Sequence, residues 1–430
     1  MHNLLPELLP EIAAQRLPGL DLGPNAIYPA YHGLSLLNLP SSICQWLGAP
    51  PIGARPLLPK LHSALQAGSQ YQNVILILVD GLGLNWFEDI RRSHPALTRI
   101  WDELLAESVL APLTSVTPST TATALTSLWS GASPAEHGIL GYEIWLKEYG
   151  VVANMIYHTA ITFHGDYNGL QRAGFDPQTF LSVPTLGPHM QHHNIQPYAL
   201  QHRAFSYSGL SQMHLKEVNI VGCRTLEDQW YNLLTIMSQK QEQNRYLYLY
   251  WSILDELCHA YGPNDPRVAL DFLSFSRSLA DFLQLLRAEK RQDTLVLLTA
   301  DHGHLPTPSN PHFELQNHPD LIDCLTIKPT SENRLPYLFV KPGREDQMLA
   351  YIAQQWPGLF KLFPAEQALE AGLFGSNGSD PRSADRLGNW LAVPQGDAYW
   401  WWADDKNPML GRHGGVSPQE MLVPLIAWKM

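Results

Sequence analysis

Three aspartates in this 430-residue sequence stand at or just after apolar segments that have the pattern of buried strands. The segments are NVILILVDGLG (73–83), which contains Asp80; YLYLYWSIL (246–254), which precedes Asp255; and TLVLLTA (294–300), which precedes Asp301. Apolar, partly β-branched runs of this length are typical of strands that are covered on both faces, as in a parallel sheet. Open α/β sheets place their ligands at the carboxyl ends of the strands, so the three carboxylates are expected to converge there.

Carboxylates that converge repel one another, and each loses hydration, unless cations lie between them. Histidines accompany two of the aspartates: His259 lies four residues after Asp255, and His302 directly follows Asp301. An i, i+4 pair on a helix turn points in one direction, so Asp255 and His259 can bind the same ion. Mixed Asp and His ligands suit Zn2+ or another first-row divalent ion such as Mn2+ better than magnesium or calcium.

Each of these motifs also has an ordinary structural interpretation. A strand that ends in Asp-Gly is common in turns, and a DxxxH segment is common on a solvated helix face. His413 lies in the glycine-flanked segment RHGG (412–415) and need bind nothing by itself. The metal centre is favoured because all the motifs occur together in one chain.

The segment TSVTPSTTATALTSLWSG (114–131) is rich in hydroxyl groups. Pro118 and the hydroxyl residues favour a turn and a helix N-cap, and Gly131 ends the helix that follows. A hydroxyl at a helix N-terminus is suited to nucleophilic attack on a phosphate. The helix dipole and the free N–H groups favour both the alkoxide of the nucleophile and the incoming phosphate. The competing hydroxyl residues are Thr114, Ser115, Thr117, Ser119, Thr120, Thr121 and Thr123; simple capping is the alternative interpretation.

The predicted fold class is α/β: a doubly wound, mostly parallel sheet with helices on both faces and inserted cap segments. Residues 1–70 are rich in proline and leucine and are interpreted as an N-terminal extension packed on the core. Residues 71–430 are interpreted as one catalytic domain, with insertions at about 150–245 and 303–396. We expect residues 150–245 to contain two or three further core elements besides an inserted cap that shapes the substrate pocket.

Composition limits the classes of partner. Hydrophobic residues make up 45% and charged residues 16% of the chain, which is typical of a globular protein with a large core. A net charge of −12 repels nucleic acid over most of the surface, so no nucleic-acid binding is expected. A small anionic substrate stays compatible with this charge, because bound cations do not appear in it.

Three features predict a cytoplasmic protein. Residues 1–20 lack the basic start and unbroken apolar stretch of a secretory signal. The chain contains no run of about 18 apolar residues, so we expect no membrane span. Four scattered cysteines without a CxxC pair indicate neither a zinc knuckle nor a disulfide framework. The sequence carries no signal for an oligomeric state.

From about residue 73 to its C-terminus the chain resembles the alkaline phosphatase superfamily, and most closely its nucleotide pyrophosphatase/phosphodiesterase-like (type I phosphodiesterase) branch. Besides the hydroxyl-rich turn, the motifs that carry the resemblance are VDGLG (79–83), EHGI (136–139), DELCHAYGP (255–263), TADHGH (299–304) and RHGG (412–415). The resemblance implies an alkaline phosphatase-like fold and a two-metal hydrolase of a small phosphate ester such as a nucleotide.

The resemblance also implies roles for single residues. One metal ion would be bound by Asp80, Asp301 and His302, with the nucleophile bridging to it. The other would be bound by Asp255, His259 and His413. In the related enzymes the nucleophile stands ten residues before the glycine that ends its helix. Counting back from Gly131 gives Thr121, which would form a covalent phospho-threonine intermediate; Thr120 is the alternative.

Two positions depart from the family pattern. Tyr142 stands where the phosphodiesterases have an asparagine that contacts a phosphate oxygen, and we interpret Tyr142 as a substrate-binding residue. Tyr250 stands where alkaline phosphatases have the glutamate of a third, magnesium site, which favours a two-metal enzyme. His304 is interpreted as a substrate-binding residue or as a neighbour of the metal ligands.

Other functions remain alternatives. The same site could serve a phosphomonoesterase or a phosphomutase, and the segment HGGVSPQEMLVPL (413–425) also resembles PglZ-like regulatory modules. Retention of every metal ligand favours an active enzyme. A sulfatase is disfavoured, because none of the four cysteines lies in a C/S-x-P-x-R motif. The aromatic residues 399–402 could stack on a nucleobase, but core packing is the favoured interpretation.

Overall fold

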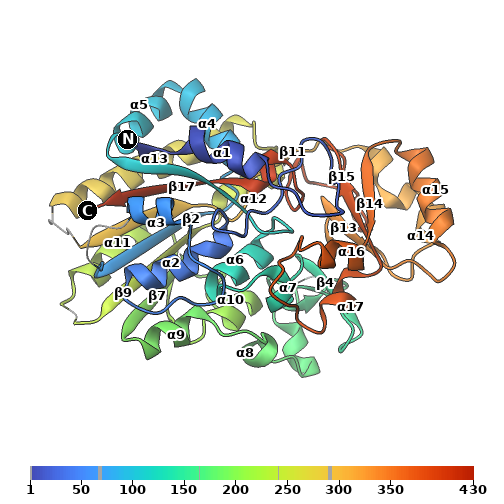
Figure 1. Ribbon diagram of the computed structural model, residues 1–430, viewed down its shortest axis with the longest axis horizontal. Helices are drawn as coiled ribbons and strands as arrows, with labels where there is room; N and C mark the ends of the chain where they lie inside the picture. Colours follow the sequence, from blue (N-terminus) through green and yellow to red (C-terminus); the bar gives the residue numbers. More distant parts are fainter. Residues whose placement is uncertain (1, 66–69, 164, 241, 289–292) are drawn as a thin grey trace.

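The computed structural model describes residues 2–65, 70–163, 165–240, 242–288 and 293–430 (Figure 1). Within these residues, eight strands form the main sheet, in which only β17 runs antiparallel to its neighbours. Their order across the sheet is β1 (His2–Asn3), β3 (Ser108–Thr114), β17 (Leu422–Lys429), β10 (Thr294–Thr299), β2 (Asn73–Val79), β9 (Asn244–Trp251), β7 (Ile195–His202) and β8 (Asn219–Cys223). The prediction of a mostly parallel sheet is therefore confirmed.

The central strands are buried on both sides, as their apolar sequences predict. Every residue of β2 and of β10 is buried. One face of the sheet is covered by α4 (Leu84–Ser93), α5 (Pro95–Ala106), α11 (Leu226–Ser238), α12 (Ile253–Tyr261) and α13 (Pro266–Ala288). The other face is covered by α2 (Leu39–Trp46), α6 (Thr121–Ser130), α9 (Leu186–His192) and α10 (Gly209–His214) (Figure 1). The doubly wound arrangement is thus confirmed.

A second sheet lies beyond one end of the main sheet, on the right in Figure 1. It contains seven of the described strands, all paired antiparallel. Their order is β14 (Phe360–Pro364), β15 (Trp390–Pro394), β13 (Leu335–Leu338), β12 (Thr330–Glu332), β4 (Glu143–Leu146), β5 (Val151–Asn154) and β6 (Thr159–Ala160). A separate short ladder joins β11 (Leu305–Pro306) to β16 (Gly411–Arg412). Helices α14 (Pro319–Ile322), α15 (Glu345–Gln355), α16 (Ala365–Glu370) and α17 (Ser383–Leu387) flank the second sheet.

The two stretches interpreted as insertions contribute differently. Residues 303–396 supply four strands of the second sheet. Residues 150–245 divide: β5 and β6 belong to the second sheet, whereas β7 and β8 extend the main sheet. That stretch therefore contributes strands to both sheets. Its core strands are hard to recognise in the sequence, because β7 (IQPYALQH) mixes polar residues and a proline into its apolar positions.

The N-terminal segment is integrated into the core. Strand β1 pairs in parallel with β3, and α1 (Leu5–Ala13) and α3 (Pro59–Leu65) pack near the same strand. The aromatic residues near 400 also pack inside: Tyr399, Trp400 and Trp402 are buried in a second hydrophobic cluster with Phe360. None of the helices in the described ranges is long and apolar enough to cross a membrane.

Candidate metal centre

The three aspartates singled out in the sequence lie at one edge of the main sheet. Asp80 directly follows β2, Asp301 lies two residues after β10, and Asp255 lies in the first turn of α12, just after β9. Because β9, β2 and β10 are adjacent and parallel, their carboxyl ends meet. The structure therefore brings the three carboxylates together.

The first cluster of ligand atoms consists of Asp80, Asp301 and His302. Their ligand atoms all lie within 4.8 Å of one another, and all three residues are buried. The His302 Nε2 lies 3.5 Å from Asp80 Oδ1 and 3.5 Å from Asp301 Oδ2. Both of these carboxylate oxygens lack a hydrogen-bond partner among the described residues. Burying a carboxylate oxygen without a hydrogen-bond partner destabilises the folded protein. A cation bound between the two oxygens removes this destabilisation.

The second cluster consists of Asp255, His259 and His413, whose ligand atoms also lie within 4.8 Å of one another. The Nε2 atoms of His259 and His413 lie 3.3 Å and 3.8 Å from Asp255 Oδ1. His413 is carried to this place by the glycine-rich loop after β16. Its ring stacks on that of His302 with centroids 3.7 Å apart, so the two clusters adjoin.

The imidazoles present their Nε2 atoms to the clusters because their Nδ1 atoms are engaged elsewhere. The backbone oxygens that accept from Nδ1 belong to Gly411 (2.9 Å from His259), Ser119 (3.0 Å from His413) and Gly303 (3.3 Å from His302). Donation at Nδ1 leaves a lone pair on Nε2. This is the tautomer and orientation that a metal-binding histidine requires.

His304 lies against the same aspartate. Its Nε2 is 2.7 Å from Asp255 Oδ1, and Asp255, His302 and His304 form a third set of converging ligand atoms. The close approach needs a glycine at position 81, where a Cβ would lie 2.8 Å from the His304 ring and φ is +78°. The structure thus places His304 beside a carboxylate of the second cluster, where it orients Asp255.

Thr121 is the first residue of α6 and is 7% exposed. Its Oγ1 lies 3.2 Å from His302 Nε2, beside the first cluster. The hydroxyl of the alternative nucleophile, Thr120, points elsewhere and donates a 2.6 Å hydrogen bond to Glu332. Of these two hydroxyls, only that of Thr121 faces the candidate metal centre.

Tyr250 and Tyr142, which differ from the residues usual in the related enzymes, have different surroundings. The Tyr250 hydroxyl donates a short hydrogen bond to Asp80 Oδ2, and burial raises its pKa well above the ordinary value, so it stays a neutral donor. The Tyr142 hydroxyl accepts a 2.5 Å hydrogen bond from Asn154. Burial, followed by the charges of Glu143 and Glu332, raises the pKa of Tyr142. Its role in substrate binding stays a prediction.

Burial and neighbouring charge set the protonation of the ligands. Burial, followed by the charges of Asp301 and Asp255, raises the pKa of Asp80 well above its usual value. Burial also disfavours the charged form of Asp255, but His259 and then His304 outweigh it and lower the pKa of Asp255. Burial lowers the pKa of His259 to about 4. Burial likewise lowers the pKa values of His302 and His413.

Metal affinity is therefore expected to fall as pH is lowered. Because burial lowers the pKa of His259 to about 4, its imidazole is neutral near pH 7, whereas the raised pKa of Asp80 means that metal and proton compete for its carboxylate. Isothermal titration of Zn2+ into metal-free protein, in buffers of different ionisation enthalpy, should show net proton release. A metal affinity that stays constant as pH is lowered would contradict this competition between metal and proton.

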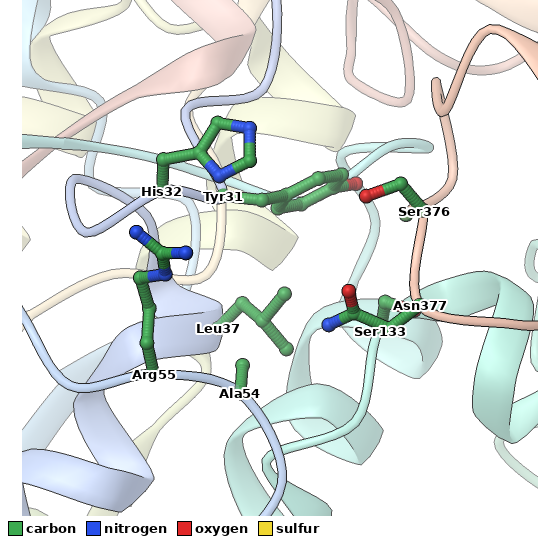
Figure 2. A pocket seen from close by; sticks show the side chains of 9 residues that line it. Tyr31, His32, Leu37, Ala54, Arg55, Ser133, Ser376 and Asn377 are labelled. Atoms are coloured by element: carbon green, nitrogen blue, oxygen red, sulfur yellow. The ribbon is translucent and has the colours of Figure 1, made fainter.

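The described residues also enclose a small cavity of about 70 Å³ (Figure 2). Its lining residues are Tyr31, His32, Leu37, Ala54, Arg55, Ser133, Gly375, Ser376 and Asn377. None of the candidate metal ligands is among them. Tyr31 links the cavity wall to the hydroxyl-rich turn, because its hydroxyl accepts a 3.1 Å hydrogen bond from the Thr117 backbone N–H. The cavity is therefore not part of the candidate metal centre.

The model of the family described as type I phosphodiesterase / nucleotide pyrophosphatase matches residues 74–415, which include every candidate ligand. The chain belongs to this family. As a member it is a phosphoric ester hydrolase, and the expectation drawn from the sequence motifs is confirmed at that level. A comparison with curated protein sequences finds no match.

Solved structures share the phosphodiesterase fold at low sequence identity. Murine ectonucleotide pyrophosphatase / phosphodiesterase 5 aligns with a TM-score of 0.61 and 16% identity, over 82% of this chain and 87% of that one. Human ectonucleotide pyrophosphatase / phosphodiesterase 5 aligns with a TM-score of 0.61 and 15% identity, over the same shares of the two chains. Phosphonoacetate hydrolase from Sinorhizobium meliloti aligns with a TM-score of 0.55 and 18% identity, over 84% of this chain and 92% of that one. A further structure of the murine protein, with a TM-score of 0.60 and 16% identity over 82% and 87%, is a complex with AMP.

Members of the phosphodiesterase family use two divalent metal ions, and the residues of this chain fit such ions. The fit rests on two clusters of carboxylate and imidazole donors and on buried carboxylate oxygens that have no hydrogen-bond partner in the described part of the chain. Two neighbours of the centre were not recognised as such in the sequence: Glu332, and Tyr250 as a donor to Asp80. The contact between Glu332 and Thr120 joins residues 212 positions apart, so no local pattern signals it.

Proposed function

We propose that this phosphodiesterase-family chain is a two-metal phosphodiesterase or nucleotide pyrophosphatase. One ion would be held by Asp80, Asp301 and His302, and the other by Asp255, His259 and His413. The observation that carries the proposal is the meeting of these two separate donor clusters beside one buried hydroxyl, that of Thr121, 3.2 Å from His302. We propose Zn2+ as the ion, with Mn2+ as the alternative, from the mixed donor set.

Bound divalent ions would lower the pKa of a coordinated hydroxyl and neutralise charge on the phosphate. Thr121 Oγ1 then attacks phosphorus, so that a bond forms from its oxygen to phosphorus and the bond from phosphorus to the leaving alcohol oxygen breaks. The product is a phospho-threonine. Water attacks this intermediate in the second step, which returns the threonine hydroxyl and releases the phosphate product.

Structure around Thr121 supports this role. The residue opens α6, so the free N–H groups of the first turn and the helix dipole favour a phosphate at that end. The imidazole rings of His259 and His413 are oriented by hydrogen bonds to backbone carbonyls. We propose a nucleotide as one class of substrate, because the murine structural neighbour is known in a complex with AMP.

A substrate panel tests the function. Protein loaded with Zn2+ or Mn2+ would be assayed with bis-p-nitrophenyl phosphate, p-nitrophenyl phosphate and a dinucleotide. We expect kcat/KM for the two diesters to exceed that for the monoester by about tenfold or more, with a phosphate monoester and no free phosphate as product. Faster cleavage of the monoester would make the enzyme a phosphomonoesterase. Absence of turnover with either ion would refute the proposal.

We also propose a cytoplasmic location. Its support is that all four cysteines, which lie within the described ranges, are free and buried, as is usual in a reducing compartment. Fractionation of source cells tests this proposal, and recovery of the protein outside the cytoplasm would contradict it.

A further inference from the structure

The N-terminus of α6 lacks the cap that its sequence offers. Thr120 is the N-cap residue and has the extended backbone of one, with φ −138° and ψ 148°. Threonine at this position usually accepts a hydrogen bond from a first-turn N–H. Among the described residues, however, no side chain caps α6. The Thr120 hydroxyl instead donates a 2.6 Å hydrogen bond to Oε1 of Glu332.

Glu332 is held firmly in the position that makes this contact. It is the last residue of β12, which pairs with β4 and β13 in the second sheet. It also packs against the loop that carries His413, since a Cβ at Gly414 would lie 2.4 Å from the Glu332 Cβ. The same loop is bonded to the turn before Thr120 through Ser119, whose hydroxyl donates to Gly415 O at 2.7 Å.

The open helix end has a chemical consequence. The first-turn N–H groups of an α-helix have no partner within the helix, and together they attract an anion. In α6 these groups lie on the same turn as the Thr121 hydroxyl. A Thr120 hydroxyl that rotated to cap the helix would bond one of them and would compete with a phosphate oxygen for it.

We propose that Glu332 is a positioning residue that holds the Thr120 hydroxyl away from the N-terminus of α6 and so keeps the first-turn N–H groups available to the substrate phosphate. The inference rests on the proposed function, in which phosphate binds beside Thr121. Glu332 itself need not touch the substrate. Its effect is on substrate binding rather than on the chemical step.

Four variants test this inference: Glu332→Ala, Glu332→Gln, Glu332→Ala combined with Thr120→Val, and Thr120→Val alone. Glu332→Ala should raise KM for the diester about fivefold to thirtyfold, the factor that corresponds to one helix cap. Its kcat should stay within about threefold of wild type. The lost contact between a first-turn N–H and a phosphate oxygen has the same strength in the ground state and in the transition state. Glu332→Gln should keep a near-normal KM, because its amide oxygen still accepts from Thr120.

The double variant gives the sharpest result. Valine cannot cap the helix, so adding Thr120→Val to Glu332→Ala should bring KM back to within about threefold of wild type. Thr120→Val alone should also leave KM near wild type. Glu143→Gln is the matched control, since Glu143 is a neighbouring carboxyl on β4 that accepts from Trp402 and does not contact Thr120. Its KM should be unchanged.

Several outcomes would overturn the inference. These are a KM in the double variant as high as in Glu332→Ala, a defect in Glu332→Gln equal to that in Glu332→Ala, or loss of kcat in Thr120→Val. Metal content and Tm would be measured for each variant, and Glu332→Gln still tests the inference if Glu332→Ala does not fold. Failure of the proposed function is separately visible, because wild-type protein would then cleave no diester.

Discussion

Replacing Thr121 by alanine is expected to lower diesterase turnover by roughly ten-thousandfold or more while both metal ions stay bound. The reason is geometric. The Thr121 hydroxyl faces the first cluster, 3.2 Å from His302 Nε2, whereas the neighbouring Thr120 hydroxyl is bonded to Glu332. Removing the nucleophile leaves the three protein ligands of each ion in place. Single-turnover kinetics together with metal analysis of the same sample make the measurement.

Two further variants sharpen this prediction. Thr121→Ser keeps a hydroxyl at the helix N-terminus and should retain a large part of the activity. Thr120→Val should remain active, because its hydroxyl does not face the clusters. Full activity in Thr121→Ala would place the nucleophile elsewhere, and inactivity of Thr120→Val with active Thr121→Ala would identify Thr120 as the nucleophile.

Replacing Asp255 by alanine should have the second large effect: loss of one ion and of at least about a thousandfold in activity. Asp255 Oδ1 is the carboxylate oxygen shared by the imidazoles of His259, His304 and His413. Without it the second cluster keeps only neutral nitrogen ligands and no negative charge to hold a divalent ion. Mass-spectrometric metal analysis should therefore give about one ion per chain instead of two.

The neighbouring residue supplies the control for this experiment. Glu256 also lies in the first turn of α12, but its side chain is exposed. Glu256→Ala removes the same charge one position away, and it should keep two ions and near-normal activity. If Asp255→Ala kept both its metal content and its turnover, the assignment of the second cluster would be wrong.

The main sheet and its polar edge could be predicted because their signals are local. Strands β2 and β10 are apolar except at their ends, where Asn73, Thr294 and Thr299 stand, and each is followed within two residues by an aspartate. Parallel pairing alone then brings Asp80 and Asp301 together. The helix at Thr121 was likewise marked by proline and hydroxyl residues before it and by Gly131 after it.

The second sheet could not be predicted in the same way. Its strands are short and mixed in character: β12 is only TSE and β13 is LPYL, and neither shows a clear alternation. Their pairing depends on contacts between segments far apart in sequence, such as Ser331 with Glu143. For this reason the position of Glu332 beside Thr120 emerges only from the three-dimensional structure.

The electrostatic surroundings of the metal centre were predictable only in part. The sequence indicates that three carboxylates must be compensated, and the structure brings His259, His302 and His413 to them. The sequence does not indicate that the Tyr250 hydroxyl donates to Asp80. These residues lie on or directly after neighbouring parallel strands, and no sequence spacing marks a contact between such strands.

Crystals grown with Zn2+ and measured across the zinc absorption edge test the central claim most directly. We expect two anomalous peaks per chain, one among Asp80, Asp301 and His302 and the other among Asp255, His259 and His413. A single peak held by Asp255, His302 and His304, which form the third converging set, would contradict the two-ion arrangement. So would the absence of any peak at this edge of the sheet.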